Sequence, residues 1–225
     1  MYADKIKAHL IIVPHADDEV LGFGGLIKKL VSNGKIVKVV VTFDTKSLVG
    51  EERSESQTLD ASYARMTLGY QELVQLKLSP DISSHDLITR YESFIQSFND
   101  EHSDIAVWTT GDCDVHQDHA KVFRCVCAAV RPYRGATPPL LSCEIPSSID
   151  QSVGSVRTRF IANFYVELSQ TELDAKITAM HQYQQEYRTG RDRDAILTYA
   201  RMRGYQIDRP YAEAFMIQRV VVYEK

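Results

Sequence analysis

One short segment of the sequence, residues 14–19, carries four side chains that are suited to acid–base or metal chemistry: His15, Asp17, Asp18 and Glu19. Three carboxylates this close together repel one another unless a cation lies among them, and carboxylate and imidazole groups are common ligands of divalent metals. His15 and Asp18 are three residues apart and would share one face of a helical first turn. Asp17 would then point elsewhere and be free to act on a water molecule. The segment therefore favours a metal site with one carboxylate left over for catalysis.

A second segment, residues 111–119, repeats this pattern farther along the chain. His116 and His119 are also three residues apart, and Asp118 lies between them. Three ligands and one open position are typical of a catalytic zinc site, in which zinc–nitrogen bonds are about 2.0–2.1 Å long. The alternative for each segment is a solvated acidic turn whose histidines only cap helices. Because both segments carry the pattern, we expect a shared metal site.

Both segments directly follow apolar runs that are typical of buried strands. Residues 6–13 read IKAHLIIV, and residues 104–110 read DIAVWTT. In an open parallel sheet, functional sites form beyond the carboxyl ends of the strands. We therefore expect the two polar segments to meet at one edge of one sheet.

Predicted strands and helices alternate along most of the chain. The strands are expected over 6–13, 35–43, 72–76, 104–110, 140–145, 160–167 and 214–223, and the helices over 20–31, 51–68, 84–98, 118–130, 171–187 and 192–202. This alternation predicts an α/β, three-layer Rossmann-like fold with a mainly parallel sheet and helices on both faces. No domain boundary is visible in the sequence, so we expect residues 1–225 to form a single domain.

The composition is that of a globular protein. The chain has 225 residues, of which 44% are hydrophobic and 25% charged, and its net charge is −4. A mildly acidic chain is a poor candidate for nucleic-acid binding, and its acidity also argues weakly against a polyanionic substrate.

No apolar run approaches the roughly 18 residues of a membrane span, and the first residues lack the pattern of a secretory signal. We therefore expect a cytoplasmic location. The sequence does not decide between a monomer and a homo-oligomer.

Two motifs together resemble a known family. The segment PHADDEVLGFGG and the distal HQDH resemble the PIG-L/LmbE-like family of zinc-dependent N-acetylglucosaminyl (GlcNAc) deacetylases. The resemblance covers nearly the whole chain: it includes residues 53–69, the pattern Lys176-xx-Ala179-x-His181-xx-Gln184, and residues 211–215 (YAEAF). One departure is Ala16, where proline is usual. Because its side chain is not a ligand, we expect only a local change in loop stiffness.

The resemblance implies a role for each residue of the two segments. It makes three residues the ligands of one Zn²⁺ per chain, with other divalent metals possible: His15, Asp18 and His119. Asp17 becomes the general base that activates the attacking water, and His116 stabilises the oxyanion or protonates the leaving amine. Asp118 becomes the partner that fixes the tautomer of His116 and raises its pKa.

The resemblance also implies a substrate and residues that contact it. The chain would remove the N-acetyl group from a small N-acetylated sugar or a GlcNAc-containing conjugate. Arg53 resembles the substrate-contacting arginine of the family; the alternative is a surface arginine paired with Glu51 or Glu52. Asp112 and Asp114 would line the entrance and bind sugar hydroxyls, and solvated loop carboxylates are the alternative.

Other functions remain open at this level. One is an amidase acting on a thiol-sugar conjugate or another N-acyl substrate, and another is a non-catalytic sugar-binding relative, although no ligand is missing. A nucleotide-binding enzyme is disfavoured because the glycines at 22, 24 and 25 follow an acidic cluster that would repel a pyrophosphate. Residues 183–194 (YQQEYRTGRDRD) are typical of a solvated face, or of a basic rim near a phosphorylated or nucleotide sugar.

Overall fold

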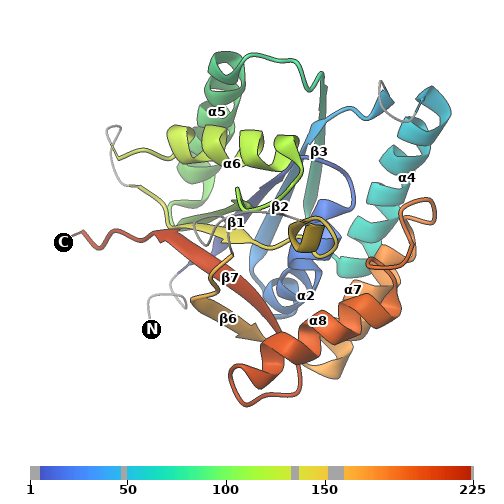
Figure 1. Ribbon diagram of the computed structural model, residues 1–225. Helices are drawn as coiled ribbons and strands as arrows, with labels where there is room; N and C mark the ends of the chain where they lie inside the picture. The colour runs from blue at the N-terminus through green and yellow to red at the C-terminus, as the bar shows by residue number, and fades with distance from the viewer. Residues whose placement is uncertain (1–5, 47–49, 133–136, 152–159, 224–225) are drawn as a thin grey trace.

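The computed structural model describes residues 6–46, 50–132, 137–151 and 160–223 (Figure 1). Within these residues, seven strands form one sheet in the order β3-β2-β1-β4-β5-β7-β6. Their bounds are β1 Ala8–Val13, β2 Ile36–Phe43, β3 Glu72–Leu78, β4 Ile105–Thr110, β5 Leu140–Cys143, β6 Phe164–Glu167 and β7 Ala212–Arg219. The first five strands in this order run parallel, and β7 runs antiparallel to both β5 and β6. The predicted mainly parallel sheet is thus confirmed.

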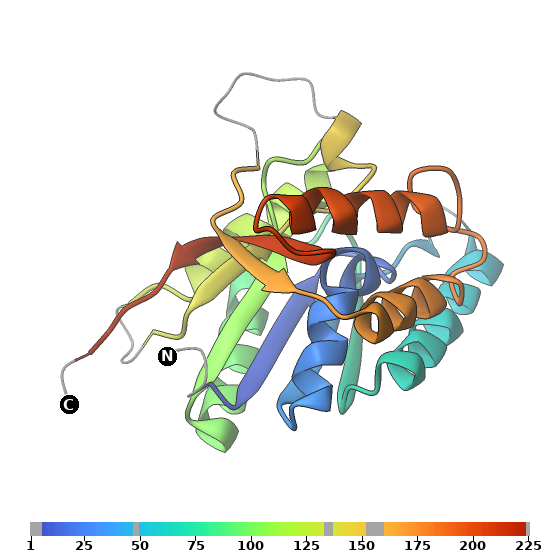
Figure 2. The ribbon, with the colours of Figure 1, turned by 90° about the horizontal axis from the view of Figure 1, so that it is seen from below.

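Helices cover both faces of this sheet (Figure 2). They are α2 Asp18–Ser32, α4 Glu51–Leu68, α5 Ser84–His102, α6 Gln117–Ala129, α7 Gln170–Met180 and α8 Arg193–Tyr205, with a 3₁₀ turn at Ile149–Gln151. One core lies between the sheet and α2, α4, α7 and α8, and the other between the sheet and α5 and α6. Among the described residues, no helix is both long and apolar enough to cross a membrane. The three-layer α/β architecture agrees with the sequence prediction.

The glycines of α2 let this helix pack closely on its neighbours. A Cβ atom on Gly22 would lie 2.5 Å from the Sγ atom of Cys143, so no larger residue fits there without a shift. The backbone N–H of Gly25 donates to the buried carboxylate of Glu213 at 2.9 Å, which also pairs with Lys176 at 2.6 Å. These glycines therefore serve packing, and the ion pair helps to hold the helix that begins at the candidate site.

The helix predicted over residues 171–187 is shorter in the structure. It begins after a Ser169 cap with a reciprocal Glu172 capping box, but it ends at Met180, and residues 181–192 form turns. Residues 171–189 contain no glycine or proline, so local preference would allow the helix to continue. Tertiary contacts outweigh that preference: the hydroxyl of Tyr183 donates to the buried Glu19 at 2.5 Å. The chain therefore turns back toward the carboxyl edge of the sheet.

Two predicted strands near the C-terminus also have different bounds. The strand predicted over 160–167 begins at Phe164, and the one predicted over 214–223 spans Ala212–Arg219. Pairing between them sets these bounds, because Phe164 to Glu167 pair with Phe215 to Ala212. Apolar runs alone do not show where a pairing partner begins.

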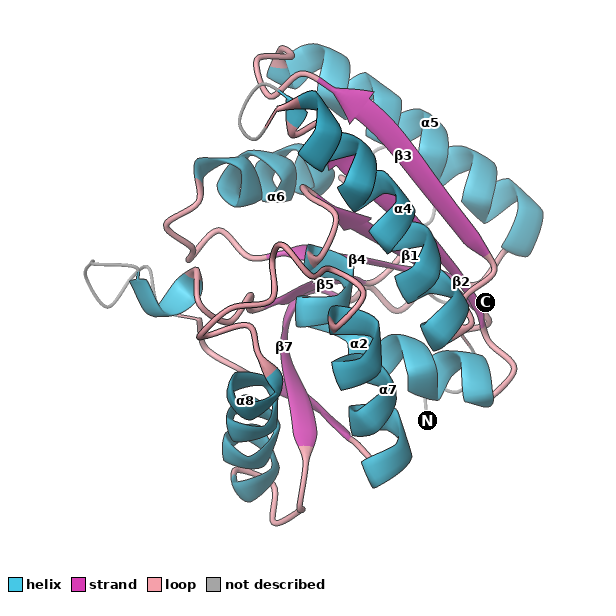
Figure 3. Cartoon of the chain, turned by 90° about the vertical axis from the view of Figure 1, so that its right-hand side faces the viewer, coloured by secondary structure: helices cyan, strands magenta, loops and turns pink. Residues whose placement is uncertain are grey.

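The segments after β1 and β4 lie side by side because these two strands are neighbours. They pair in parallel, with Ile12 opposite Thr109. Both strands therefore end at one edge of the sheet, where α2 and α6 begin. Figure 3 views this side of the molecule, with loops lying between α2, α4 and α6.

Candidate active site

The turn from β1 into α2 has an unusual backbone at Asp17. This residue precedes the first residue of α2 and has a φ angle of 104°, which non-glycine residues rarely adopt. Its carbonyl oxygen accepts hydrogen bonds from the N–H groups of Val20 and Leu21, at 3.0 and 2.9 Å. Its own N–H donates to the carboxylate of Glu19 at 3.0 Å. Backbone strain held in place by such contacts is common at functional sites.

Asp18 lies between two imidazoles that come from different segments. Its Oδ2 atom is 3.4 Å from Nδ1 of His15 and 3.3 Å from Nε2 of His119. Ligand atoms around a tetrahedral zinc ion with bonds of about 2.0–2.1 Å lie roughly 3.3–3.4 Å apart. The spacing of these donors therefore suits a tetrahedral metal, and burial keeps both Asp18 and His119 away from solvent.

A second carboxylate orients each of these two imidazoles. Nδ1 of His119 donates to Asp114 at 2.6 Å, and Nε2 of His15 donates to Asp118 at 3.1 Å. Each hydrogen bond leaves the other ring nitrogen directed at Asp18. Carboxylates in this position fix the orientation and the tautomer of metal-binding histidines. The arrangement therefore suits His15 and His119 as ligands.

These contacts differ from the roles predicted for Asp114 and Asp118. The side chain of Asp114 is only 4% exposed and pairs with His119, so it does not line the entrance as a sugar-binding group. Asp118 lies 3.9 Å from Nδ1 of His116, farther than its hydrogen bond to His15. Residue spacing did not reveal either pairing, because the loop from Gly111 to His116 has no regular structure.

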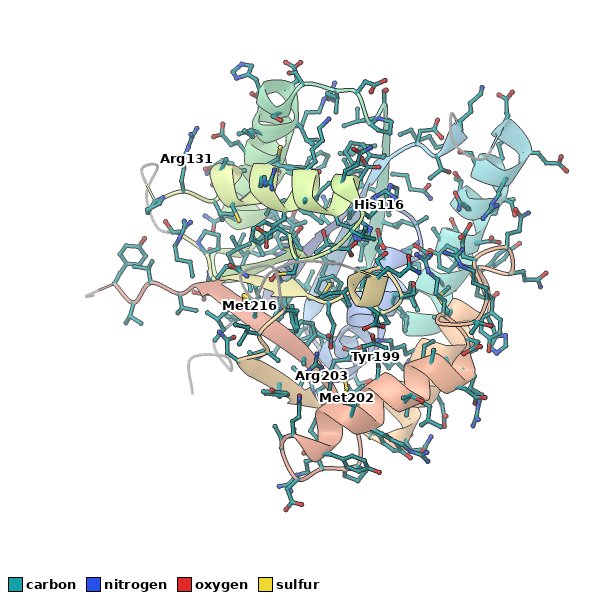
Figure 4. The ribbon with its side chains drawn as sticks, in the orientation of Figure 1. His116, Arg131, Tyr199, Met202, Arg203 and Met216 are labelled. Carbon is teal, nitrogen blue, oxygen red and sulfur yellow. The ribbon has the colours of Figure 1, made fainter. Side chains whose placement is uncertain are left out.

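His116 lies at the N-terminal end of α6, where Figure 4 labels it. Its Nδ1 atom accepts a hydrogen bond from the backbone N–H of Asp118 at 3.3 Å, so neutral His116 carries its proton on Nε2. Burial and the neighbouring His15 and His119 lower its pKa, outweighing the opposite effect of Asp118. Asp118 thus raises this pKa as predicted, but the net shift of the pKa is downward.

His15, His116 and His119 form a cluster whose ligand atoms all lie within 4.8 Å of one another. Burial alone would lower the pKa values of His15 and His119. Hydrogen bonds and charge from nearby carboxylates outweigh burial and raise these values to about 9 and about 10. For His15 these partners are Asp118 and Asp18. The same contacts keep the pKa of Asp18 well below its usual range despite its burial. The cluster therefore offers four candidate metal donors: three imidazoles and one carboxylate.

Asp17 is buried beside these donors and forms an ion pair with Arg191. Oδ2 of Asp17 lies 2.5 Å from Nη1 of Arg191. Burial raises the pKa of Asp17, Arg191 lowers it, and the nearby carboxylates of Asp18 and Glu186 raise it again, to about 7. A carboxylate with a pKa near neutrality is well suited to take up and release a proton at physiological pH.

Glu19, the third acidic residue of the first segment, points away from the donors and into the protein. One of its carboxylate oxygens accepts the hydroxyl of Tyr183, and the other accepts the N–H of Asp17. Burial raises the pKa of Glu19 to about 8, although the hydrogen bond from Tyr183 opposes this change. Glu19 therefore supports the turn that carries Asp17 and is not a metal donor.

Arg53 reaches the same site from the start of α4. Nη2 of Arg53 donates to Glu186, which also accepts Nε2 of Gln57 at 2.8 Å. The predicted alternative, a pair of Arg53 with Glu51 or Glu52, is not found among the described residues: Arg53 pairs with Glu186, and Glu51 pairs with Lys46. Asp112 is exposed and does not line the pocket.

A pocket with a volume of about 190 Å³ opens over these groups. Its lining combines the two predicted segments with α4 and the turns after α7: His15, Ala16, Asp17, Asp18, Thr45, Arg53, Gln57, His116, His119, Glu186, Arg188 and Arg191. The last three of these residues were not predicted from the sequence. The only sign of them in the sequence is the dense charge of residues 183–194. That charge is more often typical of a solvated face than of a basic rim beside a substrate.

Comparisons with known proteins identify a family to which the chain is similar. Residues 10–130, more than half of the chain, match the family described as PIG-L, GlcNAc-PI de-N-acetylase. The chain is 30% identical over 153 residues to the uncharacterized deacetylase YaiS of Escherichia coli strain K12, covering 65% of this chain and 78% of that protein.

Solved structures share the fold at lower identity. The N,N'-diacetylchitobiose deacetylase of Pyrococcus horikoshii has a TM-score of 0.74 and 18% identity, with 96% of this chain and 85% of that chain covered. The 4-carboxy-2-hydroxymuconate hydratase of Pseudomonas putida KT2440 has a TM-score of 0.77 and 15% identity, with 98% and 99% covered. These likenesses are to the fold, whereas the matched residues of the sequence place the chain in a family. The chain belongs to the PIG-L family of deacetylases, as its two motifs predicted.

Proposed function

We propose that the protein is a metal-dependent hydrolase that removes the N-acetyl group from an N-acetylamino sugar or a GlcNAc-containing conjugate. The observation that carries this proposal is the position of Asp17. It is a buried carboxylate with a pKa near 7, directly beside a carboxylate and two imidazoles that converge at metal-ligand spacing. Membership of a deacetylase family supports the same reaction.

The proposed ligands of one zinc ion per chain are His15, Asp18 and His119. His116 is close enough to replace Asp18, but its hydrogen bonding disfavours this. Its Nδ1 atom already accepts an N–H group, so its Nε2 atom keeps the proton of the neutral ring and has no free lone pair for a metal. A zinc ion bound here would polarise the acyl carbonyl and lower the pKa of a water molecule.

Asp17 is the proposed general base. Its pKa near 7 lets it accept a proton from the attacking water and pass that proton to the leaving amine nitrogen. The strained turn, the N–H donated to Glu19 and the ion pair with Arg191 hold the carboxylate in one position. A fixed base avoids the loss of rate that comes from a misplaced catalytic group.

His116 is the proposed hydrogen-bond donor to the carbonyl oxygen as negative charge develops on it. Its proton on Nε2 and its lowered pKa favour a neutral donor over an acid that gives up its proton. Arg53 is the proposed substrate contact at the pocket wall.

The test is to load the protein with zinc and screen acylated sugars for release of a free amine. The panel contains N-acetylated sugars, nucleotide sugars and thiol-sugar conjugates, with the Asp17→Asn variant as the matched control. We expect amine release from at least one N-acetylated sugar and its loss in the control. Release only from thiol-sugar conjugates would favour an amidase instead. The proposal fails if the zinc-loaded protein releases no amine from any compound, or if Asp17→Asn releases amine at the wild-type rate.

A further inference from the structure

Three arginines gather around one carboxylate in the wall of the pocket. Arg53 donates to Oε1 of Glu186, while Arg188 and Arg191 lie 3.4 and 3.9 Å from its Oε2 atom. All three arginines line the pocket that contains the candidate catalytic groups. They come from the start of α4 and from the turns after α7, so the fold brings these charges together from distant parts of the sequence.

The local charge of this pocket differs from that of the whole chain. The chain is acidic, with a net charge of −4, but the pocket lining has three arginines against three carboxylates, those of Asp17, Asp18 and Glu186. A divalent ion at the proposed site would make this lining positive. The weak argument against an anionic substrate, which rested on the charge of the whole chain, therefore does not apply to the pocket.

Two of the three arginines have hydrogen-bonding capacity that the protein does not use. Arg191 is engaged by Asp17 and donates its Nε to Ser147 at 3.0 Å. Within the described residues, however, Nε of Arg53 is buried and has no hydrogen-bond partner. The side chain of Arg188 is 57% exposed, and its only polar contact with another described residue is the long one of 3.4 Å to Glu186.

The unused donors indicate a ligand of a particular kind. A buried N–H group without a partner is costly, and when the protein itself does not satisfy such a group, an ordered water or a bound ion can do so. The planar guanidinium groups of Arg53 and Arg188 match the oxygen geometry of phosphates and carboxylates. Neutralisation of the Glu186 carboxylate does not by itself explain why three arginines gather here. Oε1 of Glu186 already accepts hydrogen bonds from both Arg53 and Gln57.

We propose that Arg53 and Arg188 bind an anionic group, a phosphate or a carboxylate, on the sugar that occupies this pocket. The inference rests on the proposed function for the identity of the sugar substrate, and it adds the class of substituent. The substrate would then be an acylated amino sugar with a negative charge within reach of these two arginines. Arg188 would be a specificity-determining residue at the pocket mouth.

The test measures binding of sugars that contain no amide and so are not hydrolysed. Isothermal titration of the zinc-loaded protein compares glucose with glucose 1-phosphate, glucose 6-phosphate and glucuronate. We expect at least one anionic sugar to bind about tenfold more tightly than glucose, the scale of one charge-assisted hydrogen bond. Comparison of phosphates with glucuronate distinguishes the two kinds of anion. The preference should weaken as salt is added.

Variants show whether the arginines cause this preference. Arg188→Gln and Arg53→Gln should each narrow the ratio of anionic to neutral affinity by about three- to tenfold. Arg201→Gln, which changes an exposed arginine on α8 outside the pocket, should keep the ratio. Arg188 is largely exposed, so its variant should fold, and thermal melting checks the Arg53 variant.

Two results would overturn the inference: a wild-type protein that binds anionic and neutral sugars equally, or a preference that survives both arginine variants. The second result would assign anion binding to the metal alone. Failure of the proposed function is recognised separately, because it is read from amine release. If no amine is released while the arginine-dependent preference is found, anion recognition stands and the deacetylase proposal fails.

Discussion

Asp17 and Arg191, which are 174 positions apart in the sequence, form a buried ion pair: Nη1 of Arg191 lies 2.5 Å from Oδ2 of Asp17. The pair joins the strained turn before α2 to the turns that follow α7. Because an adjacent positive charge stabilises the ionised carboxylate, Arg191 opposes the effect of burial on the pKa of Asp17.

Replacement of Arg191 should therefore change the pH dependence of the reaction. In Arg191→Gln the pKa of Asp17 should rise, so the base is deprotonated only at higher pH. We expect the acidic limb of the kcat/KM profile to move up by about one pH unit. Arg201→Gln is the matched control and should leave the limb in place. An acidic limb that does not move in Arg191→Gln would mean that another group controls it.

Asp17→Asn should separate catalysis from metal binding. Asparagine has the same shape and tolerates a positive φ angle better than most residues, so the turn should keep its conformation. It has no basic carboxylate, and we expect turnover to fall at least about 100-fold while zinc stoichiometry is unchanged. Measurement of metal content and amine release on the same preparation checks both parts. Loss of zinc from this variant would place Asp17 among the ligands.

Metal content should also decide between Asp18 and His116 as the third ligand. Elemental analysis of Asp18→Asn and His119→Ala should show loss of stoichiometric zinc, because both residues lie at the centre of the donor cluster. His116→Ala should retain zinc, because its Nδ1 atom accepts the N–H of Asp118 and the neutral ring has no second free lone pair. The reverse pattern, zinc lost in His116→Ala and kept in Asp18→Asn, would assign the site to the three histidines.

The sequence was sufficient to predict the parts of the site that strands position directly. The two polar segments follow β1 and β4, and parallel pairing of these strands brings His15 and His119 together. Arg191 and Glu186 were not assigned, because Glu186 fell within the helix predicted over residues 171–187 and both residues belong to the charged segment 183–194, which is typical of a solvated face.

The partners of Asp114 and Asp118 could not be inferred for a different physical reason. Both belong to the segment that leads from β4 into α6, where side-chain directions depend on loop geometry rather than on a helical or strand period. Spacing along the chain placed Asp118 beside His116, but in space it is closer to His15. Pairings between the two segments become visible only when both are placed at the same sheet edge.

Removal of the metal should make the stability of the protein depend on pH. The folded-state pKa values of His15 and His119, about 9 and about 10, lie above the ordinary value of 6.5. A raised histidine pKa stabilises the fold below about pH 6.5, and this contribution is lost as the pH rises through 9 and 10. The raised pKa values of Asp17 and Glu19, about 7 and about 8, act in the same direction, because ionisation of these buried groups is unfavourable.

We therefore expect EDTA-treated protein to lose stability steadily between about pH 7 and pH 10. Zinc-loaded protein should be less sensitive, because a metal ion binds neutral imidazoles and replaces their protons. Urea unfolding at several pH values, with and without zinc, measures both curves. Metal-free stability that stays constant or rises over this range would contradict the assigned imidazole–carboxylate contacts.

His116 offers a last distinction, between a hydrogen-bond donor and a general acid. Its lowered pKa keeps the ring neutral at physiological pH, with the proton on Nε2 available for donation. His116→Ala removes this donor and should lower kcat by roughly 100- to 1000-fold, the effect of losing one oxyanion donor. His116→Gln restores an N–H donor that does not titrate, so it should recover part of this loss. Because glutamine cannot act as an acid, recovery in His116→Gln with an unmoved basic limb of the pH profile would support the donor role. If His116→Gln is as slow as His116→Ala and both variants lose the basic limb, His116 is instead the acid that protonates the leaving amine.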